Sequence, residues 1–84
     1  MNVFIIGSGT FGTAIANELA RNNKNKVVIF SRSKEKKDEI NLFHTNKKYF
    51  PDKILNDSLV STNEYSDIQN ADIIFLALPS STII

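Results

Sequence analysis

The sequence predicts an α/β fold built on a parallel sheet. Short apolar runs rich in β-branched residues alternate with segments of helical or turn character, as in strands joined by right-handed crossover connections. All 3 glycines of the chain fall in one short stretch directly after the first apolar run. A length of 84 residues allows one small domain with a marginal core.

The first third of the chain predicts a strand, a helix and a second strand. Residues 3–6 and 27–30 are continuous apolar runs of the kind found in strands buried on both faces. Between them, Phe11, Ile15 and Leu19 recur every four residues, which predicts a helix with one apolar stripe. A cluster of asparagines then marks the turn that leads into the second strand.

The middle of the chain predicts a second helix and a loop. Ser33 is expected to cap a helix that extends to about Phe43, with the charged residues 34–39 as its solvated outer face. Residues 46–57 are expected to form a loop, because Pro51 stops a helix and polar residues dominate.

The last third of the chain predicts two more strands. Residues 59–61 suit a short third strand, residues 64–70 a helical turn or two, and the longest apolar run, 73–78, a fourth buried strand closed by Pro79. In the usual strand order of such sheets, 3-2-1-4, the fourth strand is an open edge, continued here by the apolar residues 83–84. An open apolar edge favours self-association, either as a dimer or as an aggregate.

The composition excludes several classes of partner and compartment. The 10 basic and 9 acidic residues nearly cancel, so no nucleic acid and no anionic membrane surface is expected as a partner. The chain has no cysteine, so it holds no disulfide and no thiolate metal site, and a cytoplasmic location is expected. The apolar run at residues 3–6 is too short for a signal peptide, and no stretch is long enough to span a membrane.

The glycine spacing is Gly-x-Gly-x-x-Gly, between a predicted strand and a predicted helix. This arrangement is the dinucleotide-binding fingerprint of the Rossmann fold, in which each glycine has its own role. Gly7 allows a sharp turn off the strand, Gly9 leaves the backbone bare for a pyrophosphate, and Gly12 lets the helix lie close to the strand. The main-chain N–H groups from Ser8 to Gly12 are then expected to bind the two phosphates. A tight turn that binds nothing is the alternative.

The residues after the second strand bear on the choice of cofactor. A site that prefers NAD usually has Asp or Glu there, which accepts hydrogen bonds from the ribose 2′-hydroxyl. This chain has Ser31 and Arg32 instead, and an arginine can hold a 2′-phosphate through its fork of donors. The sequence therefore favours NADP over NAD. The alternative is that Arg32 stacks on the adenine or lies in solvent.

Four stretches of the chain form a familiar set: GSGTFGTAIANELARN, FSR, KKYFP and ADIIFLALPS. In order and spacing they resemble the N-terminal part of NAD(P)-dependent glycerol-3-phosphate dehydrogenase of the bacterial type. Phe11 before the last glycine, Arg32 after the second strand, residues 49–51 and residues 78–80 each fit the family's pattern. Residues 52–56 depart from it, because they lack the glycine and the second proline that the family has there.

The resemblance implies a set of cofactor contacts. Along the bound dinucleotide they are Thr10, Phe11, Ser31, Arg32 and Tyr49, and near the nicotinamide they are Leu78, Pro79 and Ser80. Two alternatives stay open: Phe11 fills the core as part of its helical stripe, or Tyr49 anchors its loop. His44 has no partner that the sequence identifies and is interpreted as a polar surface residue.

The resemblance also implies a reaction for a longer protein. That reaction is the reduction of dihydroxyacetone phosphate, a small phosphorylated substrate, to sn-glycerol 3-phosphate. This product feeds phospholipid synthesis. The family's catalytic lysine and helical substrate domain follow the point where this sequence stops. Residues 1–84 are therefore expected to form the N-terminal part of a Rossmann-type domain, truncated after about four strands and inactive alone. The alternatives are a non-catalytic nucleotide-binding module or gene remnant, and another NADP-dependent dehydrogenase, such as a ketopantoate reductase or 6-phosphogluconate dehydrogenase type.

Overall fold

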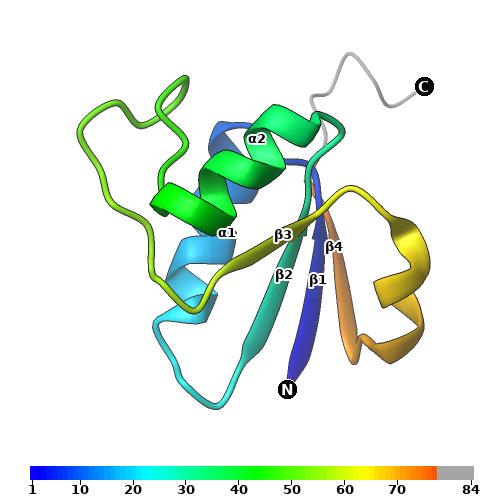
Figure 1. The fold of residues 1–84 in the computed structure, drawn as a ribbon. Helices are drawn as coiled ribbons and strands as arrows, with labels where there is room; N and C mark the ends of the chain where they lie inside the picture. The colour runs from blue at the N-terminus through cyan, green and yellow to red at the C-terminus, as the bar shows by residue number, and fades with distance from the viewer. Residues whose placement is uncertain (78–84) are drawn as a thin grey trace.

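The computed structural model describes residues 1–77, which form a parallel sheet with its larger helices on one face (Figure 1). The four strands are β1 (Asn2–Ile6), β2 (Lys26–Phe30), β3 (Val60–Thr62) and β4 (Ile73–Leu76). Their order across the sheet is β3-β2-β1-β4, and every neighbouring pair is parallel. The predicted Rossmann-type α/β fold and its strand order are therefore confirmed.

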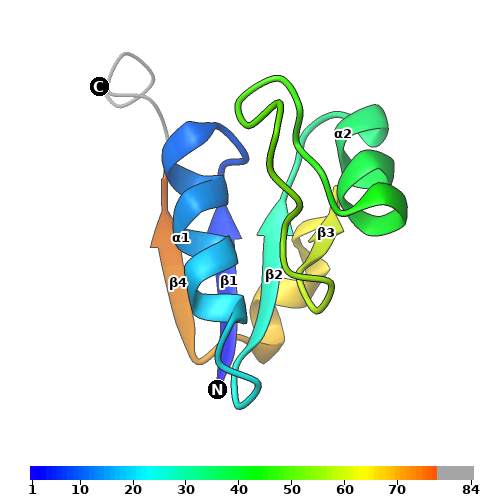
Figure 2. The ribbon, with the colours of Figure 1, turned by 90° about the vertical axis from the view of Figure 1, so that its left-hand side faces the viewer.

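Two helical segments cover one face of the sheet, and a third lies on the other face (Figures 1 and 2). The covering segments are α1 (Thr10–Ala20) and α2 (Lys34–Asp38), which continues into the π-helical turn η1 (Glu39–Phe43). The 3-10 helix η2 (Tyr65–Asn70) connects β3 to β4 on the opposite side. None of these helices is both long enough and apolar enough to cross a membrane.

The core lies between α1 and the two central strands. Alternate residues of β1 and β2 face the helix, and the core contains Val3, Ile5, Val27 and Ile29 from the strands. The loop between η1 and β3 lies across the same face, between α1 and α2 in Figure 2, and it adds the buried Leu55 and Leu59. The predicted loop at 46–57 is thus confirmed, and its Leu55 helps to close the core.

The apolar stripe predicted for α1 holds for Ile15 and Leu19, which pack against the core, and is wrong for Phe11. Phe11 is 70% exposed, and Ile15 and Leu19 are only half-buried at the side of the core. The residues of α1 that face the sheet are instead small, namely Gly12, Thr13, Ala16 and Ala20. Branched side chains of the strands occupy the space between the layers, so small residues on the helix allow a close approach.

The second helix begins as predicted but is less solvated than expected. Ser33 is its N-cap, and the Ser33 hydroxyl accepts a hydrogen bond from the Lys36 N–H at 3.3 Å. Residues 36–39 are half-buried, so the expected solvated face is wrong for this part. The Glu39 carboxylate accepts from the Thr45 hydroxyl and from the Lys47 N–H, both at 2.8 Å. These bonds connect the helix to the start of the following loop.

Strand β4 was expected to be buried, and it is not. Its four residues are 37% to 60% exposed, because β4 is the edge of the sheet and only one of its sides pairs with β1. Within residues 1–77, the predicted edge position of this strand is confirmed, while residues 83 and 84, expected to continue the apolar edge, lie outside the described residues. Residues 78 and 79, where the strand was expected to end, lie outside the described residues.

Candidate functional site

A groove of about 920 Å³ opens beyond the carboxyl ends of β1 and β2. In open parallel sheets, ligands bind at this edge, where the chain reverses its direction of travel across the sheet. The glycine turn, the segment after β2 and the turn around Tyr49 form its walls. The full lining comprises Ile6, Gly7, Ser8, Gly9, Thr10, Phe11, Phe30, Arg32, Ser33, Lys36, Lys48, Tyr49, Tyr65 and Ala77.

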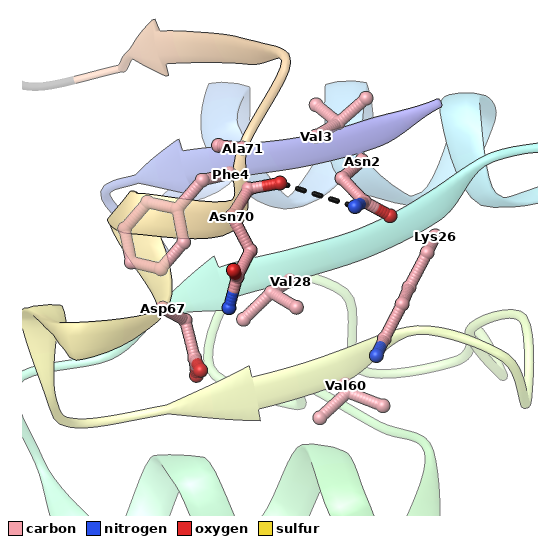
Figure 3. A pocket seen from close by; sticks show the side chains of 9 residues that line it. All are labelled: Asn2, Val3, Phe4, Lys26, Val28, Val60, Asp67, Asn70 and Ala71. Carbon is pink, nitrogen blue, oxygen red and sulfur yellow. Dashed lines mark hydrogen bonds between the residues drawn. The ribbon is translucent and has the colours of Figure 1, made fainter.

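A second hollow lies on the other face of the sheet, beside η2 (Figure 3). It measures about 170 Å³ and is lined by strand side chains such as Phe4 and Val28, with Lys26 and Asp67 as its charged groups. The Asn2 side chain donates a hydrogen bond to the Asn70 carbonyl across it, at 3.1 Å. This hollow is small and has few convergent polar groups, so the larger groove is the candidate site.

Two glycines are required by the geometry of the turn between β1 and α1. Gly7 has a φ of 118°, a conformation that residues with a Cβ rarely adopt. A Cβ added to Gly12 would lie 2.1 Å from the Gly7 carbonyl oxygen, so no other residue fits without moving the backbone. These findings agree with the steric roles that the sequence assigns to both glycines.

Gly9 differs from the other two glycines. The nearest atom to an added Cβ there is Cζ of Tyr49 at 4.0 Å, so packing alone does not demand a glycine. A side chain at this position would instead enter the groove beside Tyr49. That the bare backbone serves the approach of a ligand stays a prediction.

The start of α1 presents unpaired backbone donors. Within residues 1–77, the N–H groups of residues 8–12 donate no hydrogen bond. The N-cap, Gly9, has no side chain to bond them, and the first turn of the helix contains no acidic residue. Unpaired N–H groups and the positive end of the helix dipole together favour an anion at this point.

Three cations line the groove. Lys36 lies 4.6 Å and Lys48 5.5 Å from the centre of the Tyr49 ring, measured from each ammonium nitrogen. Arg32 is exposed at the end of β2. In the part of the chain that the structure describes, no carboxylate is among the lining residues. The groove is therefore positively charged, although the net charge of the whole chain is only +1.

An aromatic pair forms part of the wall near the end of β2. The Phe30 and Tyr65 rings stack with their centres 4.1 Å apart and their planes 13° from parallel. Phe30 is buried, and Tyr65 is exposed at the groove. Such a flat apolar surface can stack against a planar ring of a ligand.

The structure brings together most of the residues that the sequence singles out. Residues 7–11, Arg32 and Tyr49 line the groove, and Gly12 lies behind it against the glycine turn. Phe11 is exposed at the groove, so the alternative that it fills the core is wrong. Leu78, Pro79 and Ser80 lie outside the described residues.

Ser31 has a different setting from its neighbour Arg32. It is fully buried, its hydroxyl lies 2.8 Å from the Ser61 hydroxyl, and it does not line the groove. Its proposed contact with a cofactor stays a prediction. His44 is half-buried at the end of η1 with a φ of 57°, and it too lies away from the groove.

Sequence reasoning missed seven of the lining residues: Ile6, Phe30, Ser33, Lys36, Lys48, Tyr65 and Ala77. Lys36 lies in the charged run at residues 34–39, which the sequence presents only as a solvated helix face. No sequence pattern identifies Tyr65, because its position at the groove depends on where the chain runs after β3.

Within residues 1–77, no group of acidic residues and histidine is arranged to hold a metal ion.

Comparison with known proteins gives a consistent result. A family model described as the N-terminus of NAD-dependent glycerol-3-phosphate dehydrogenase matches residues 2–84. Glycerol-3-phosphate dehydrogenase [NAD(P)+] of Orientia tsutsugamushi is 45% identical over 83 residues, and that of Mesoplasma florum is 37% identical over 83 residues. The match covers 99% and 98% of this chain, respectively, but only 25% of each relative.

Solved structures agree with the sequence comparison. A crystal structure of glycerol-3-phosphate dehydrogenase from Coxiella burnetii superposes with a TM-score of 0.81 at 28% identity, over 94% of this chain and 24% of that one. A structure of the Plasmodium falciparum enzyme superposes with a TM-score of 0.84 at 28% identity, over 99% and 26% of the two chains. The chain thus spans about a quarter of the length of the proteins that it matches.

Proposed function

The chain belongs to the NAD-dependent glycerol-3-phosphate dehydrogenase family, whose N-terminal part it matches, and from this premise we propose that it binds NADP or NAD in the groove. The observation that carries the proposal is the row of unpaired N–H groups at residues 8–12, at the positive end of α1. A diphosphate is an anion of suitable size for that row of donors. Residues 1–84 then act as the first part of a dinucleotide-binding domain.

The orientation of the cofactor follows from the charges and rings along the groove. The adenosine end lies toward Arg32 and the Phe30–Tyr65 pair, where a cation and a flat apolar surface are available. The nicotinamide end lies beyond β4, toward Leu78, Pro79 and Ser80. When bound, the cofactor supplies the hydride, and this chain supplies the binding and the orientation.

We propose further that NADP is preferred over NAD. Arg32, Lys36 and Lys48 are all cations of the groove, and no carboxylate lines it within residues 1–77. A 2′-phosphate adds two negative charges that this set of cations attracts, whereas a carboxylate would repel them.

The test of this preference is the substitution Arg32→Ala in the intact gene product. The expected result is a loss of NADPH affinity of about tenfold with little change for NADH, because one charge-assisted contact is removed. Fluorescence titration of both reduced cofactors measures it. The control is Arg21→Ala, since Arg21 pairs with Glu18 on α1, away from the groove. Equal losses for NADPH and NADH would refute the preference.

For the complete protein, we propose the reduction of dihydroxyacetone phosphate to sn-glycerol 3-phosphate in the cytoplasm, as a supply for phospholipid synthesis. The relatives that carry this name have about four times the length of the matched part, since the match covers 25% of each. Substrate binding and acid–base catalysis belong to that further part. Oxidation of NADPH by the intact gene product, dependent on dihydroxyacetone phosphate, tests the reaction. Cofactor binding without any turnover would favour a non-catalytic nucleotide-binding module instead.

We also propose that the 84-residue chain associates with itself through β4. The exposed residues of this edge strand are all apolar, and its outer N–H and C=O groups face no strand within residues 1–77. Pairing with a second copy would satisfy those groups and cover the apolar side chains.

A further inference from the structure

The Ser8 carbonyl oxygen is the meeting point of three hydrogen bonds. It accepts from the Thr13 hydroxyl at 3.1 Å, from the Asn46 side-chain amide at 3.0 Å and from the Lys36 ammonium group at 3.4 Å. The Asn46 amide also donates to the Thr13 hydroxyl at 3.0 Å. Thr13 and Asn46 are completely buried, and the bond between their side chains is shielded from water, while the bonds to the Ser8 carbonyl are partly buried.

The direction of this carbonyl fixes the direction of the next N–H. A trans peptide is planar, and its C=O and N–H point to opposite sides. The peptide between Ser8 and Gly9 is trans. Since its oxygen is bonded to the buried Thr13 and Asn46, the Gly9 N–H points away from that pair, and it donates no hydrogen bond within residues 1–77.

Asn46 also controls the opposite wall of the groove. Its backbone carbonyl accepts hydrogen bonds from the N–H groups of Tyr49 at 3.1 Å and Phe50 at 2.9 Å, which closes the turn that carries Lys48 and Tyr49. One buried residue therefore connects the glycine turn with the turn that faces it. The loop that supplies Asn46 lies far from the glycines in sequence, so no local pattern indicates this link.

We propose that Asn46, together with Thr13, is a positioning residue of the diphosphate site. The pair holds the Ser8–Gly9 peptide so that the N–H groups from Gly9 onward face the groove and not the core. This role rests on the proposed binding of a dinucleotide. Without the pair, only the Lys36 ammonium group still bonds the Ser8 carbonyl, so the peptide is less restrained, and a bound diphosphate must reorder it at a cost in affinity.

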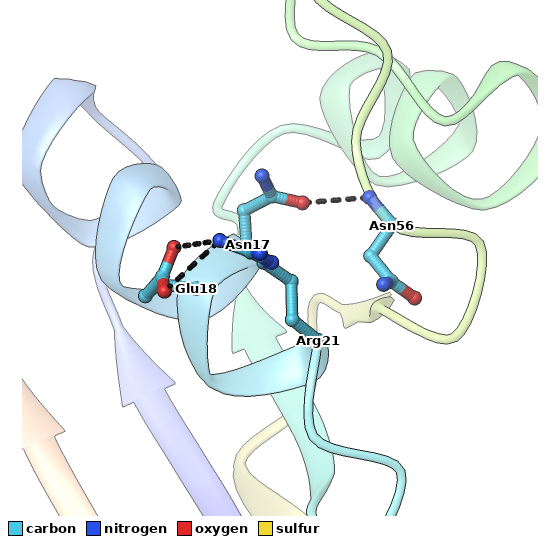
Figure 4. Close-up of polar contacts among 4 residues, drawn as sticks. All are labelled: Asn17, Glu18, Arg21 and Asn56. Carbon is cyan, nitrogen blue, oxygen red and sulfur yellow. Dashed lines mark hydrogen bonds and ion pairs between the residues drawn. The ribbon is translucent and has the colours of Figure 1, made fainter.

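The structure contains a matched control for this role. The Asn17 side-chain oxygen accepts a hydrogen bond from the Asn56 N–H at 2.6 Å (Figure 4). Like the bond between Asn46 and Thr13, this bond connects α1 with the loop between η1 and β3. It does not involve Ser8, and neither Asn17 nor Asn56 lines the groove. A variant at Asn17 therefore weakens the attachment of the loop and leaves the glycine turn unchanged.

The experiment measures NADPH and NADH dissociation constants of the intact gene product by fluorescence titration. Asn46→Ala and Thr13→Val are each expected to raise both constants by about five- to tenfold, whereas Asn17→Ala and the conservative Thr13→Ser leave them within about twofold. Because Asn46 and Thr13 act on the same carbonyl, the double variant should lose less than the product of the single effects. The Gly9 amide resonance of the ligand-free protein should move in Asn46→Ala and stay in Asn17→Ala.

Two results would overturn the inference. The first is unchanged cofactor affinity in a folded Asn46→Ala variant. The second applies if the Asn46→Ala variant does not fold: the cofactor dissociation constants of Thr13→Val and Thr13→Ser would then be equal. Failure of the proposed function is distinct, because the unmodified protein would then bind neither NADPH nor NADH.

Discussion

At the scale of single residues, the three glycines divide between folding and binding. Gly7 and Gly12 are required by the backbone, through a positive φ and through a contact of 2.1 Å with an added Cβ. Gly9 has room for a Cβ in the direction of Tyr49, and its φ of −79° is open to any residue. The fingerprint therefore contains two positions that the backbone requires and one, Gly9, that packing alone does not require.

This division predicts opposite outcomes for two equivalent substitutions. Gly12→Ala is expected to lower the free energy of unfolding by about 2–3 kcal/mol, because the methyl group overlaps the Gly7 carbonyl. Gly9→Ala is expected to change it by less than about 1 kcal/mol and to weaken NADPH binding. Urea unfolding and fluorescence titration measure the two quantities. Equal destabilisation by both substitutions would contradict the division.

The residue scale also shows where sequence reasoning ends. The glycines, Arg32 and Tyr49 are recognisable because their residue types and spacing have a known chemical use. Asn46 and Lys36 are not, because an asparagine in a polar loop and a lysine in a charged helix have no pattern of their own. Their positions at Ser8 depend on the path of the loop and on the angle of α2, which are set by tertiary packing.

At the scale of elements, the strands were easier to predict than the faces of the helices. Runs of branched apolar residues predicted β1 and β2 to within one residue, because strands buried on both faces need no periodicity. The stripe predicted for α1 was wrong for Phe11, while Ile15 and Leu19 pack beside the small residues that the closely packed helix buries most deeply. Periodicity identified the helix, but the volume of the side chains decided its orientation.

The edge strand β4 carries a prediction at this scale. Ile74 is 50% exposed on β4, and Val60 is 45% exposed on β3 at the opposite edge of the sheet. Ile74→Lys is expected to reduce self-association of the 84-residue chain, because a charge on an edge strand opposes strand pairing. Val60→Lys is the control and should have little effect. Sedimentation at high concentration measures both, and a monodisperse monomer without either substitution would refute the self-association.

At the scale of the whole molecule, positive charge is concentrated at one site. The chain has a net charge of +1, yet Arg32, Lys36 and Lys48 face the same groove beside the start of α1. Fold, helix dipole and side-chain charge therefore favour an anion at the same edge of the sheet. The chain spans about a quarter of the relatives' length, and the proposed cofactor groove lies in the part that matches their family's N-terminus.

The most direct test is a titration of the ¹⁵N-labelled intact gene product with NADPH, followed through the backbone amide resonances. Binding of the diphosphate to the unpaired N–H groups predicts that the amides of residues 8–12 move more than any others. Phosphate-free nicotinamide riboside at the same concentration should leave them in place. If NADPH binds and these amides do not move, the diphosphate lies elsewhere and the assignment of the groove is wrong.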